Sequence, residues 1–475
     1  MTLCLVMAAV FYLLGYSGMM PLSNAYKESA MLLILVPLLI FSIQHKVKKV
    51  TIRRLAATIY FFFITTILFA GMLHTLRSGY IVFAIILIIM PGFYIVWADR
   101  GDINSLFDKI ASVWSVIGFV FYVICFVCMP PDNVHFYLGR YSGLTINPNI
   151  MGMVTVSVLA AALYLIMLGR LNSLAIVDTG ISLAMMWLSG SRTAFLADLC
   201  MIAAFIIIAI KGKDPLQRGS KSIMAALALS LVIGAFVFYT AEIPAEQMGY
   251  KGIDMIREIT DSSQKFTEKE LRELEDQGIA IPTGEITEPT HIASIQLQPV
   301  CAQVYASAEA DIAEEKGESE RTGLGHDGAT LSERMTGYDD IYGVFNGRLE
   351  IYSQILEQIN LTGHVHREPF TLQNGEKQDY AHNTPIDFTY ICGVPSGLSS
   401  LMIYIITAIY VLTSIFGRKQ LDPGRTYALL IMIGFGIESM LEIQLIFGSR
   451  GLVMLFYIVF AEIFAERRLP KHDVE

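Results

Sequence analysis

The stretch that decides the fold is residues 150–168, IMGMVTVSVLAAALYLIML. It contains no charged residue, and its length is close to the ~20 residues that an α-helix needs to cross ~30 Å of hydrocarbon. An alternating strand of a membrane barrel is shorter and less uniformly apolar. The stretch therefore predicts a transmembrane helix.

Apolar runs of this kind recur along the whole chain. Of its 475 residues, 54% are hydrophobic and only 16% are charged, whereas soluble domains carry about 25% charged residues. Twelve runs can be delimited, at 2–20, 29–43, 54–73, 79–97, 110–129, 150–168, 171–188, 193–210, 221–240, 395–416, 424–441 and 447–465. The sequence thus predicts an all-α integral membrane protein with about 12 transmembrane helices.

The orientation follows from the unequal distribution of lysine and arginine between alternate loops. One set of loops, which includes both ends of the chain, carries basic clusters within 46–54, 211–221 and 467–471. The alternate short loops carry only lone basic residues, namely Lys27, Arg77, Arg140, Arg192 and Arg450. Because basic loops stay in the cytoplasm, we expect both termini there and the lone basic residues outside.

One large hydrophilic loop, residues 241–394, interrupts the pattern between the ninth and tenth runs. By the same alternation it lies on the outer face. Its first part, 241–335, is acidic and lacks an apolar period, so we expect it to be mobile. Its second part, 336–394, is expected to be helical and to hold the functional groups of the loop. The remaining domains are then the nine spans of 1–240 and, in 395–475, three spans with a short cytoplasmic tail.

An amphipathic pattern within the loop predicts a helix over residues 338–359. The apolar stripe of that helix would contain Ile341, Phe345, Leu349, Tyr352, Leu356 and Ile359. We expect this stripe to pack against the membrane domain.

The first outward-facing motif is Asn147-Pro148-Asn149, just before the sixth run. Proline restricts the conformation of Asn147, and Asn149 is suited to cap the next helix. This structural interpretation leaves Arg140 and Asn147 without a role, so a binding function remains an equal alternative for them.

The second motif is the turn Ser189-Gly190-Ser191-Arg192, which places a cation at the membrane surface. Either Arg192 extends to lipid headgroups, or it binds a phosphate next to a helix N-terminus, with the Ser191 hydroxyl nearby.

The third motif, Asn346-Gly347-Arg348, lies in the amphipathic loop helix. Its arginine can form a surface ion pair with Asp340 or Glu350, or bind an anion.

The fourth motif is His382-Asn383, followed by Gly393 and Gly397 at the entry to a span. A histidine at the mouth of a membrane domain can act as a general base near neutral pH, although an ordinary solvated loop histidine is the alternative. The glycines would allow close approach of helices or a bent entry. His364 and His366 lack further ligands at metal-site spacing, which disfavours a metal centre.

Together these segments resemble the superfamily of O-antigen ligases and Wzy-type polysaccharide polymerases. The span number, the late outer loop, Asn147-Pro148-Asn149, the Ser-Gly-Ser-Arg turn, Asn346-Gly347-Arg348 and the His382-Asn383-x9-Gly-x3-Gly element occur in the family's order. The resemblance covers nearly the whole chain, and the histidine element is its most specific part. It implies a GT-C-like membrane fold in the bacterial cytoplasmic (inner) membrane.

The resemblance also implies an activity. Family members transfer an undecaprenyl-diphosphate-linked oligosaccharide to an acceptor hydroxyl, with inversion and with no metal or other cofactor. By motif, Arg192 and Arg348 would bind the donor diphosphate and His382 would deprotonate the acceptor, which is a glycan or a lipid-linked glycan. Supporting residues would be Asn147, Asn149, Arg140, Ser191, Asn383 and Arg450. Membrane lipid and a chain-length regulator or flippase are the expected partners, and nucleic acid is not.

The acidic part of the loop, 241–335, departs from the ligase pattern and leaves the acceptor open. We favour a repeat-unit polymerase because no dedicated acceptor-docking element stands out; an O-antigen-type ligase or a protein O-oligosaccharyltransferase are the alternatives. A transporter or flippase of lipid-linked sugars is the competing class. It should place ionisable groups within the membrane, whereas Asp198, Glu438 and Glu442 all lie near the outer ends of their runs.

Overall fold

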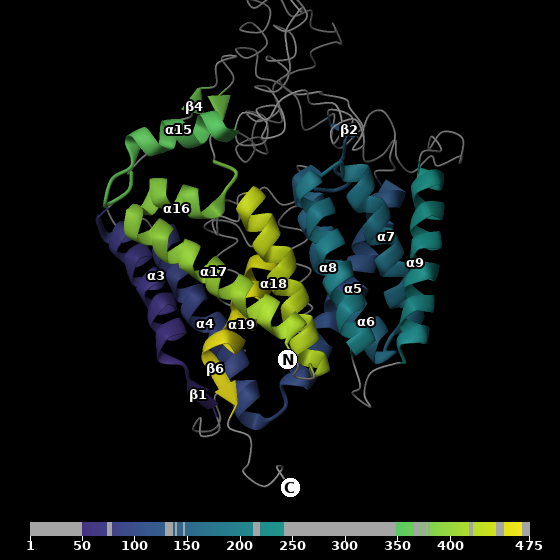
Figure 1. The fold of residues 1–475 in the computed structure, drawn as a ribbon. Coiled ribbons are helices and arrows are strands. Elements are labelled where there is room, and N and C mark those ends of the chain that lie inside the picture. Colours follow the sequence, from purple (N-terminus) through teal and green to yellow (C-terminus); the bar gives the residue numbers. More distant parts are fainter. Residues whose placement is uncertain are drawn as a thin grey trace, which may run out of the picture.

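The computed structural model describes residues 50–73, 78–128, 136–137, 140–145, 148–211, 219–241, 348–364, 370–371, 377–378, 381–417, 421–442 and 451–467. Within these ranges the chain is mainly helical (Figure 1). The first two expected spans and the acidic segment 251–335 lie outside them.

The helices of the membrane domain coincide with the remaining apolar runs. They are α3 (Arg54–Leu73), α4 (Ser78–Arg100), α5 (Ile103–Cys128), α6 (Pro148–Leu168), α7 (Asn172–Ser189), α8 (Arg192–Lys211), α9 (Ser220–Ala241), α17 (Val394–Phe416), α18 (Pro423–Leu441) and α19 (Gly451–Phe464). Seven helices in the described ranges are long and apolar enough to cross a membrane: α3, α4, α5, α6, α8, α9 and α17. This is fewer than the twelve spans expected. Of the other three, α19 is short, with 14 residues, and α7 and α18 do not combine the required length and hydropathy.

Helix α5 begins at Ile103, earlier than the apolar run that predicted it at residue 110. The extra turns contain Asp108, which accepts a hydrogen bond of 2.7 Å from the Tyr164 hydroxyl and pairs with Arg170. The charged residue is thereby satisfied within the bundle, so it does not end the helix.

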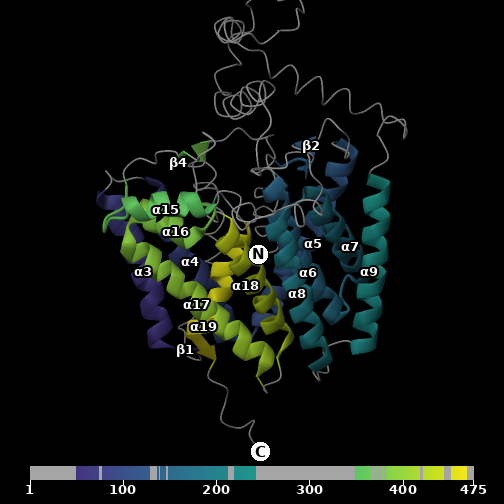
Figure 2. The same cartoon turned by 45° about the horizontal axis from the view of Figure 1, so that its top comes forward.

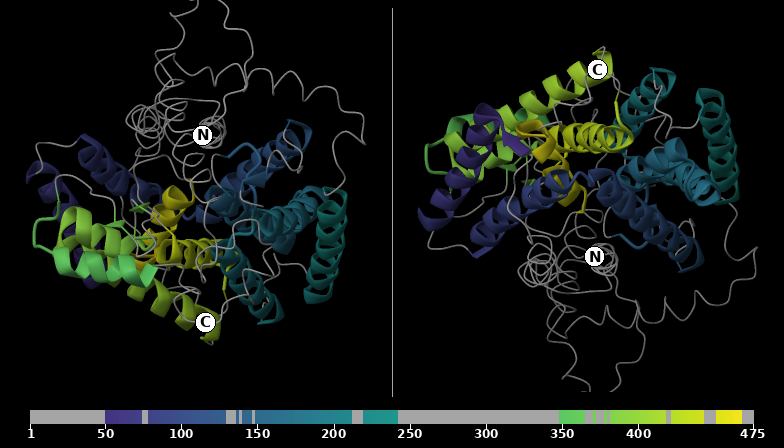
Figure 3. Two further views of the ribbon diagram at one scale, coloured as in Figure 1. Left: turned by 90° about the horizontal axis from the view of Figure 1, so that it is seen from above. Right: turned by 90° about the horizontal axis from the view of Figure 1, so that it is seen from below.

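The bundle has two groups of helices joined around α6 and α18 (Figures 1 and 2). Helices α3, α4, α17 and α19 pack together, and α5, α6, α7, α8 and α9 form the other group. Helix α18 contacts α8 and α6 on one side and α19 and α17 on the other. Helix α6 is buried along almost its whole length, which explains why it has no polar face. Seen along the bundle axis, α9 lies at the rim (Figure 3).

The all-α prediction needs one correction, because three short two-stranded antiparallel sheets also form. They pair β1 (Val50–Ile52) with β6 (Ala465–Arg467), β2 (Phe136–Tyr137) with β3 (Arg140–Tyr141), and β4 (Phe370–Thr371) with β5 (Lys377–Gln378). The loop backbones satisfy their hydrogen-bonding groups in this way where no helix continues.

The described part of the large loop contains two helices, α15 (Arg348–Gln358) and α16 (Thr384–Cys392), which lie over one end of the bundle (Figure 1). The stripe predicted for the first is only partly right. Tyr352 and Ile359 are half-buried and pack against the core, but Ile351 and Ile355 are the fully buried residues and Leu356 is 67% exposed. Helix α15 contacts β4 and α16, and this neighbourhood selects the face of Ile351 rather than that of Leu356.

The opposite end of the bundle is joined by polar contacts between chain segments. Arg425 Nε donates to Glu462 Oε1 over 2.7 Å, and Lys211 Nζ donates to the Ile415 carbonyl over 2.9 Å. With the Asp108–Arg170 pair, these contacts link α5, α6, α8, α17, α18 and α19. The loop helices and the predicted functional motifs therefore lie at one end and the basic loops at the other.

Candidate functional site

The N-terminus of α16 is held rigidly by polar side chains. Asn383 caps this helix: its Oδ1 accepts from the Ile386 amide (3.1 Å), and its Nδ2 donates to the Met440 carbonyl (2.9 Å). Asp387 Oδ1 accepts from the Ala381 amide over 3.3 Å. The loop before α16 is thus fixed both to its own helix and to the end of α18.

His382 lies within this fixed loop in a left-handed conformation, with φ of 51°. Residues other than glycine rarely adopt this region, and when they do the surroundings must offset a cost of about 1–2 kcal/mol. The hydrogen bonds of Ala381 and Asn383 supply that constraint. Such strained residues cluster at functional sites.

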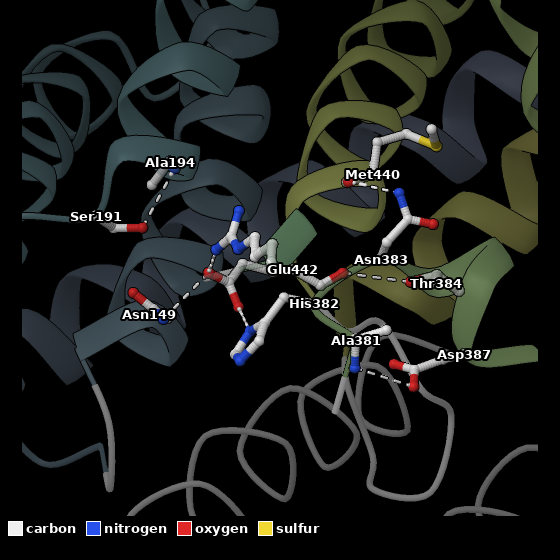
Figure 4. A network of polar contacts seen from close by, with 11 residues as sticks. Asn149, Ser191, Ala194, Ala381, His382, Asn383, Thr384, Asp387, Met440 and Glu442 are labelled. Carbon is white, nitrogen blue, oxygen red and sulfur yellow. Dashed lines mark hydrogen bonds and ion pairs between the residues drawn. The ribbon is translucent and has the colours of Figure 1, made fainter. Parts of the chain in front are cut away.

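Three residues from distant parts of the chain meet on the carboxylate of a fourth, Glu442 (Figure 4). Glu442, which follows α18, receives Arg348 Nη2 on Oε1 over 3.0 Å and Asn149 Nδ2 on the same oxygen over 3.2 Å. Its other oxygen, Oε2, lies 3.0 Å from His382 Nδ1. His382 thus contacts one oxygen of the carboxylate, and Arg348 and Asn149 contact the other.

This Glu442 cluster, defined as Asn149, Arg348, His382 and Glu442, is partly shielded from solvent. The side chain of Glu442 is 8% exposed, that of Arg348 17% and that of His382 27%. Charge-assisted hydrogen bonds in such a setting are stronger than surface ion pairs. Burial raises the pKa of the neighbouring Tyr352, so that its hydroxyl remains neutral.

Several helix termini also point to this end of the bundle. Helices α6, α8 and α16 have their N-termini there, and α15 begins with Arg348 itself (Figure 1). The exposed amides at helix N-termini carry partial positive charge and favour anions. Of these helices, α6 and α15 contact the Glu442 carboxylate through Asn149 and Arg348, whereas Glu442 itself lies at the C-terminus of α18.

Arg192 is the first residue of α8 and is half-buried. The preceding Ser191 caps the helix, with Oγ accepting from the Ala194 amide over 3.3 Å. Gly152 of α6 faces this turn: a Cβ at Gly152 would lie 2.8 Å from Ala194 Cβ and 3.0 Å from Ser191 Cβ. Glycine therefore lets the start of α8 lie against α6, one turn from Asn149.

The structure changes the roles of the supporting residues. Asn149 lies inside the first turn of α6 and contacts Glu442, so it is not the helix cap that the sequence suggested. Ser191 and Asn383 act as helix caps, and the Asn383 side chain does not hydrogen-bond His382 in the described contacts. Arg140 belongs to β3. Asn147 and Arg450 lie outside the described residues.

The glycines of the fourth motif allow close backbone approach, as expected. Gly393, with φ of 88°, separates α16 from α17 and packs against the backbone of Leu361, and a side chain at Gly397 would overlap Thr389. His364 has a structural environment: its Nδ1 lies 2.8 Å from the Tyr390 carbonyl and its Nε2 3.2 Å from Asn360 Nδ2. His366 is outside the described ranges, within which no cluster of three or more potential metal ligands occurs.

Glu442 and Asp387 are the residues of this site whose roles sequence reasoning missed. Glu442 was considered only as a membrane charge near the end of a run. A usable signal was present, because a glutamate directly after an apolar run that ends at the outer face needs a cationic partner, and the outer motifs supply Arg348 and His382.

No protein-family model matches the chain, and no curated protein or solved structure is significantly similar to it.

Proposed function

We propose that the chain is a membrane glycosyltransferase that moves an undecaprenyl-diphosphate-linked glycan to an acceptor hydroxyl at the outer face of the bacterial cytoplasmic membrane. The observation that carries this proposal is the Glu442 cluster. Three residues selected independently from outward-facing sequence motifs, Asn149, Arg348 and His382, meet on one carboxylate. They do so at the end of a bundle whose helices are long enough to cross a membrane.

His382 acts as the general base in this proposal. Its Nδ1 contacts Glu442 Oε2 at 3.0 Å, which leaves Nε2 as the nitrogen that takes the proton. A carboxylate on the other ring nitrogen orients the imidazole and stabilises its protonated form. Glu442 is thus a positioning residue for His382.

The transfer step balances as a single displacement. His382 Nε2 removes the proton of the acceptor hydroxyl, and the oxygen attacks the anomeric carbon of the donor. The new C–O bond forms as the bond from that carbon to the diphosphate breaks, and undecaprenyl diphosphate leaves with the electron pair. Arg348 and Arg192 stabilise the growing negative charge of the leaving group.

A repeat-unit polymerase is our first choice of acceptor class, with ligation to another glycan or to protein as alternatives. The discriminating experiment is to incubate the purified full-length protein with lipid-linked repeat units and to separate the products by size. A ladder of chain lengths supports the polymerase, and a single addition to a different acceptor supports a ligase. Absence of any new glycosidic bond, with every acceptor class supplied, contradicts the proposal.

A transporter of lipid-linked sugars is the second candidate, because two aspartates are buried within the bundle. Asp178 of α7 accepts a hydrogen bond from Ser115 of α5, and both oxygens of Asp198 in α8 lack a hydrogen-bond partner among the described residues. Buried carboxylates are common along ion paths in transporters. Movement of donor across liposomes without a new glycosidic bond would favour this class.

A further inference from the structure

The two donors on Glu442 Oε1 come from separate elements. Arg348 opens α15 in the outer loop, and Asn149 lies in the first turn of α6 in the membrane domain. Both reach the same carboxylate oxygen, at 3.0 and 3.2 Å. Carboxylate and phosphate oxygens accept hydrogen bonds from the same donors. Glu442 Oε1 therefore occupies a position that a phosphate oxygen would fit.

We infer that Glu442 is an internal occupant of the diphosphate site, which the donor displaces from Arg348 and Asn149 when it binds. This inference rests on the proposed function for the identity of the donor. Glu442 then keeps its contact with His382 while Arg348 and Asn149 bind the diphosphate. Donor binding is thereby coupled to activation of the base.

The geometry allows this exchange without movement of the backbone. Glu442 is held through its main chain: its amide donates to the Glu438 carbonyl over 2.7 Å, and its own carbonyl accepts from the Thr384 hydroxyl over 3.4 Å. Its side chain can rotate about its own bonds while these contacts persist. His382 contacts Oε2 whereas Arg348 and Asn149 contact Oε1, so a rotation of the carboxylate that keeps Oε2 near His382 can release the other two contacts.

The exchange has an energetic consequence for the histidine. While Arg348 shares the carboxylate, the guanidinium withdraws negative charge from the contact with His382 Nδ1. A diphosphate on Arg348 removes this competition, so the contact between Glu442 and His382 becomes stronger when the donor is present. By reciprocity, a stronger contact between Glu442 and His382 promotes diphosphate binding.

The test is a titration of the purified full-length protein with inorganic diphosphate, paired with the rate of transfer. Glu442→Gln and Glu442→Ala each weaken or remove the internal competitor. We expect both to bind diphosphate about fivefold to tenfold more tightly, which corresponds to the net contribution of one ordinary hydrogen bond, about 1 kcal/mol. Their turnover at saturating donor should fall, because His382 loses its carboxylate. If Glu442 had only a structural role, its substitution would not raise the affinity for diphosphate while lowering the turnover.

The matched control is Glu462→Gln. Glu462 is also a buried glutamate that accepts from an arginine, Arg425, but it lies at the opposite end of the bundle. The Glu462→Gln variant should bind diphosphate as tightly as the wild type. Asn149→Ala should bind diphosphate more weakly, because it removes one of the two donors. Thermal unfolding checks that each variant is folded.

Unchanged or weaker diphosphate binding in both Glu442 variants would overturn the exchange. This outcome is distinguishable from failure of the proposed function. If the protein forms no glycosidic bond, the titration still decides whether Glu442 competes with an anion. If the wild type forms the product but the Glu442 variants bind diphosphate no more tightly than the wild type, the proposed transfer activity is supported and the proposed exchange is wrong.

Discussion

At the scale of single residues, the sequence singled out Asn149, Arg348 and His382 as site residues but not Glu442, the carboxylate that they all contact. Glu442 is 60 residues from His382, 94 from Arg348 and 293 from Asn149. Local motifs mark Asn149, Arg348 and His382, and the place of Glu442 after an apolar run indicates that it needs a cationic partner. The spacing along the chain does not show that all three residues contact it. The motif singled out His382, but it did not predict the left-handed conformation of this residue.

The same scale gives a prediction for the arginines. Arg348→Ala should lower transfer by about 100-fold, because a group that stabilises charge in the transition state is lost. Arg348→Lys should restore little, since an ammonium cannot bind phosphate in the bidentate way of a guanidinium. We expect the same for Arg192: Arg192→Ala should lower transfer, and Arg192→Lys should restore little of it.

The measurement is the initial rate at saturating and at limiting donor. Glu350→Gln, also in the first turn of α15 but without a place in the Glu442 cluster, is the control. Full activity of both lysine variants would exclude bidentate contact with the diphosphate.

At the scale of elements, helices were predicted well because the bilayer imposes length and composition on each of them. The bounds of α3 coincide with the predicted run, whereas α5 extends further because Asp108 has partners on α6 and in the following turn. The buried face of α15 was predicted only in part, for another reason. Its buried face depends on α16 and β4, whose placement the sequence does not reveal.

Gly152 provides a prediction at this scale. Gly152→Val should push the start of α8 away from α6, destabilising the fold by about 1–3 kcal/mol and lowering transfer although His382 is intact. The decrease in activity follows from displacement of Arg192 relative to Asn149. Thermal unfolding and transfer rate should both be measured.

Gly436→Val is the matched control, because a Cβ at Gly436 of α18 would meet no atom within 4 Å. It should unfold close to the wild-type temperature and retain its activity. A Gly152→Val variant with wild-type stability and rate would show that the close approach of α6 and α8 is unnecessary.

At the scale of the whole molecule, alternation of basic and motif-bearing loops predicted the separation of two ends. The Glu442 cluster lies at one end, and the Arg425–Glu462 and Arg170–Asp108 pairs lie at the other. The side of the membrane that each end faces rests on the charge rule alone.

Labelling of single introduced cysteines tests that orientation. Leu361→Cys, at a residue that is 74% exposed in the loop after α15, should react in intact spheroplasts with a membrane-impermeant maleimide. Ser222→Cys, exposed in the first turn of α9, should react only after permeabilisation. The parent chain with its native cysteines gives the background, and the reverse pattern would invert the proposed topology.

The central claim is that the Glu442 cluster forms glycosidic bonds with His382 as the base. The most direct measurement quantifies both glycan product and released undecaprenyl diphosphate from purified wild-type protein and from His382→Ala. We expect one released undecaprenyl diphosphate per new glycosidic bond from the wild type and a loss of at least about 100-fold in a folded His382→Ala variant. A His382→Ala variant that transfers glycan at the wild-type rate would contradict the account.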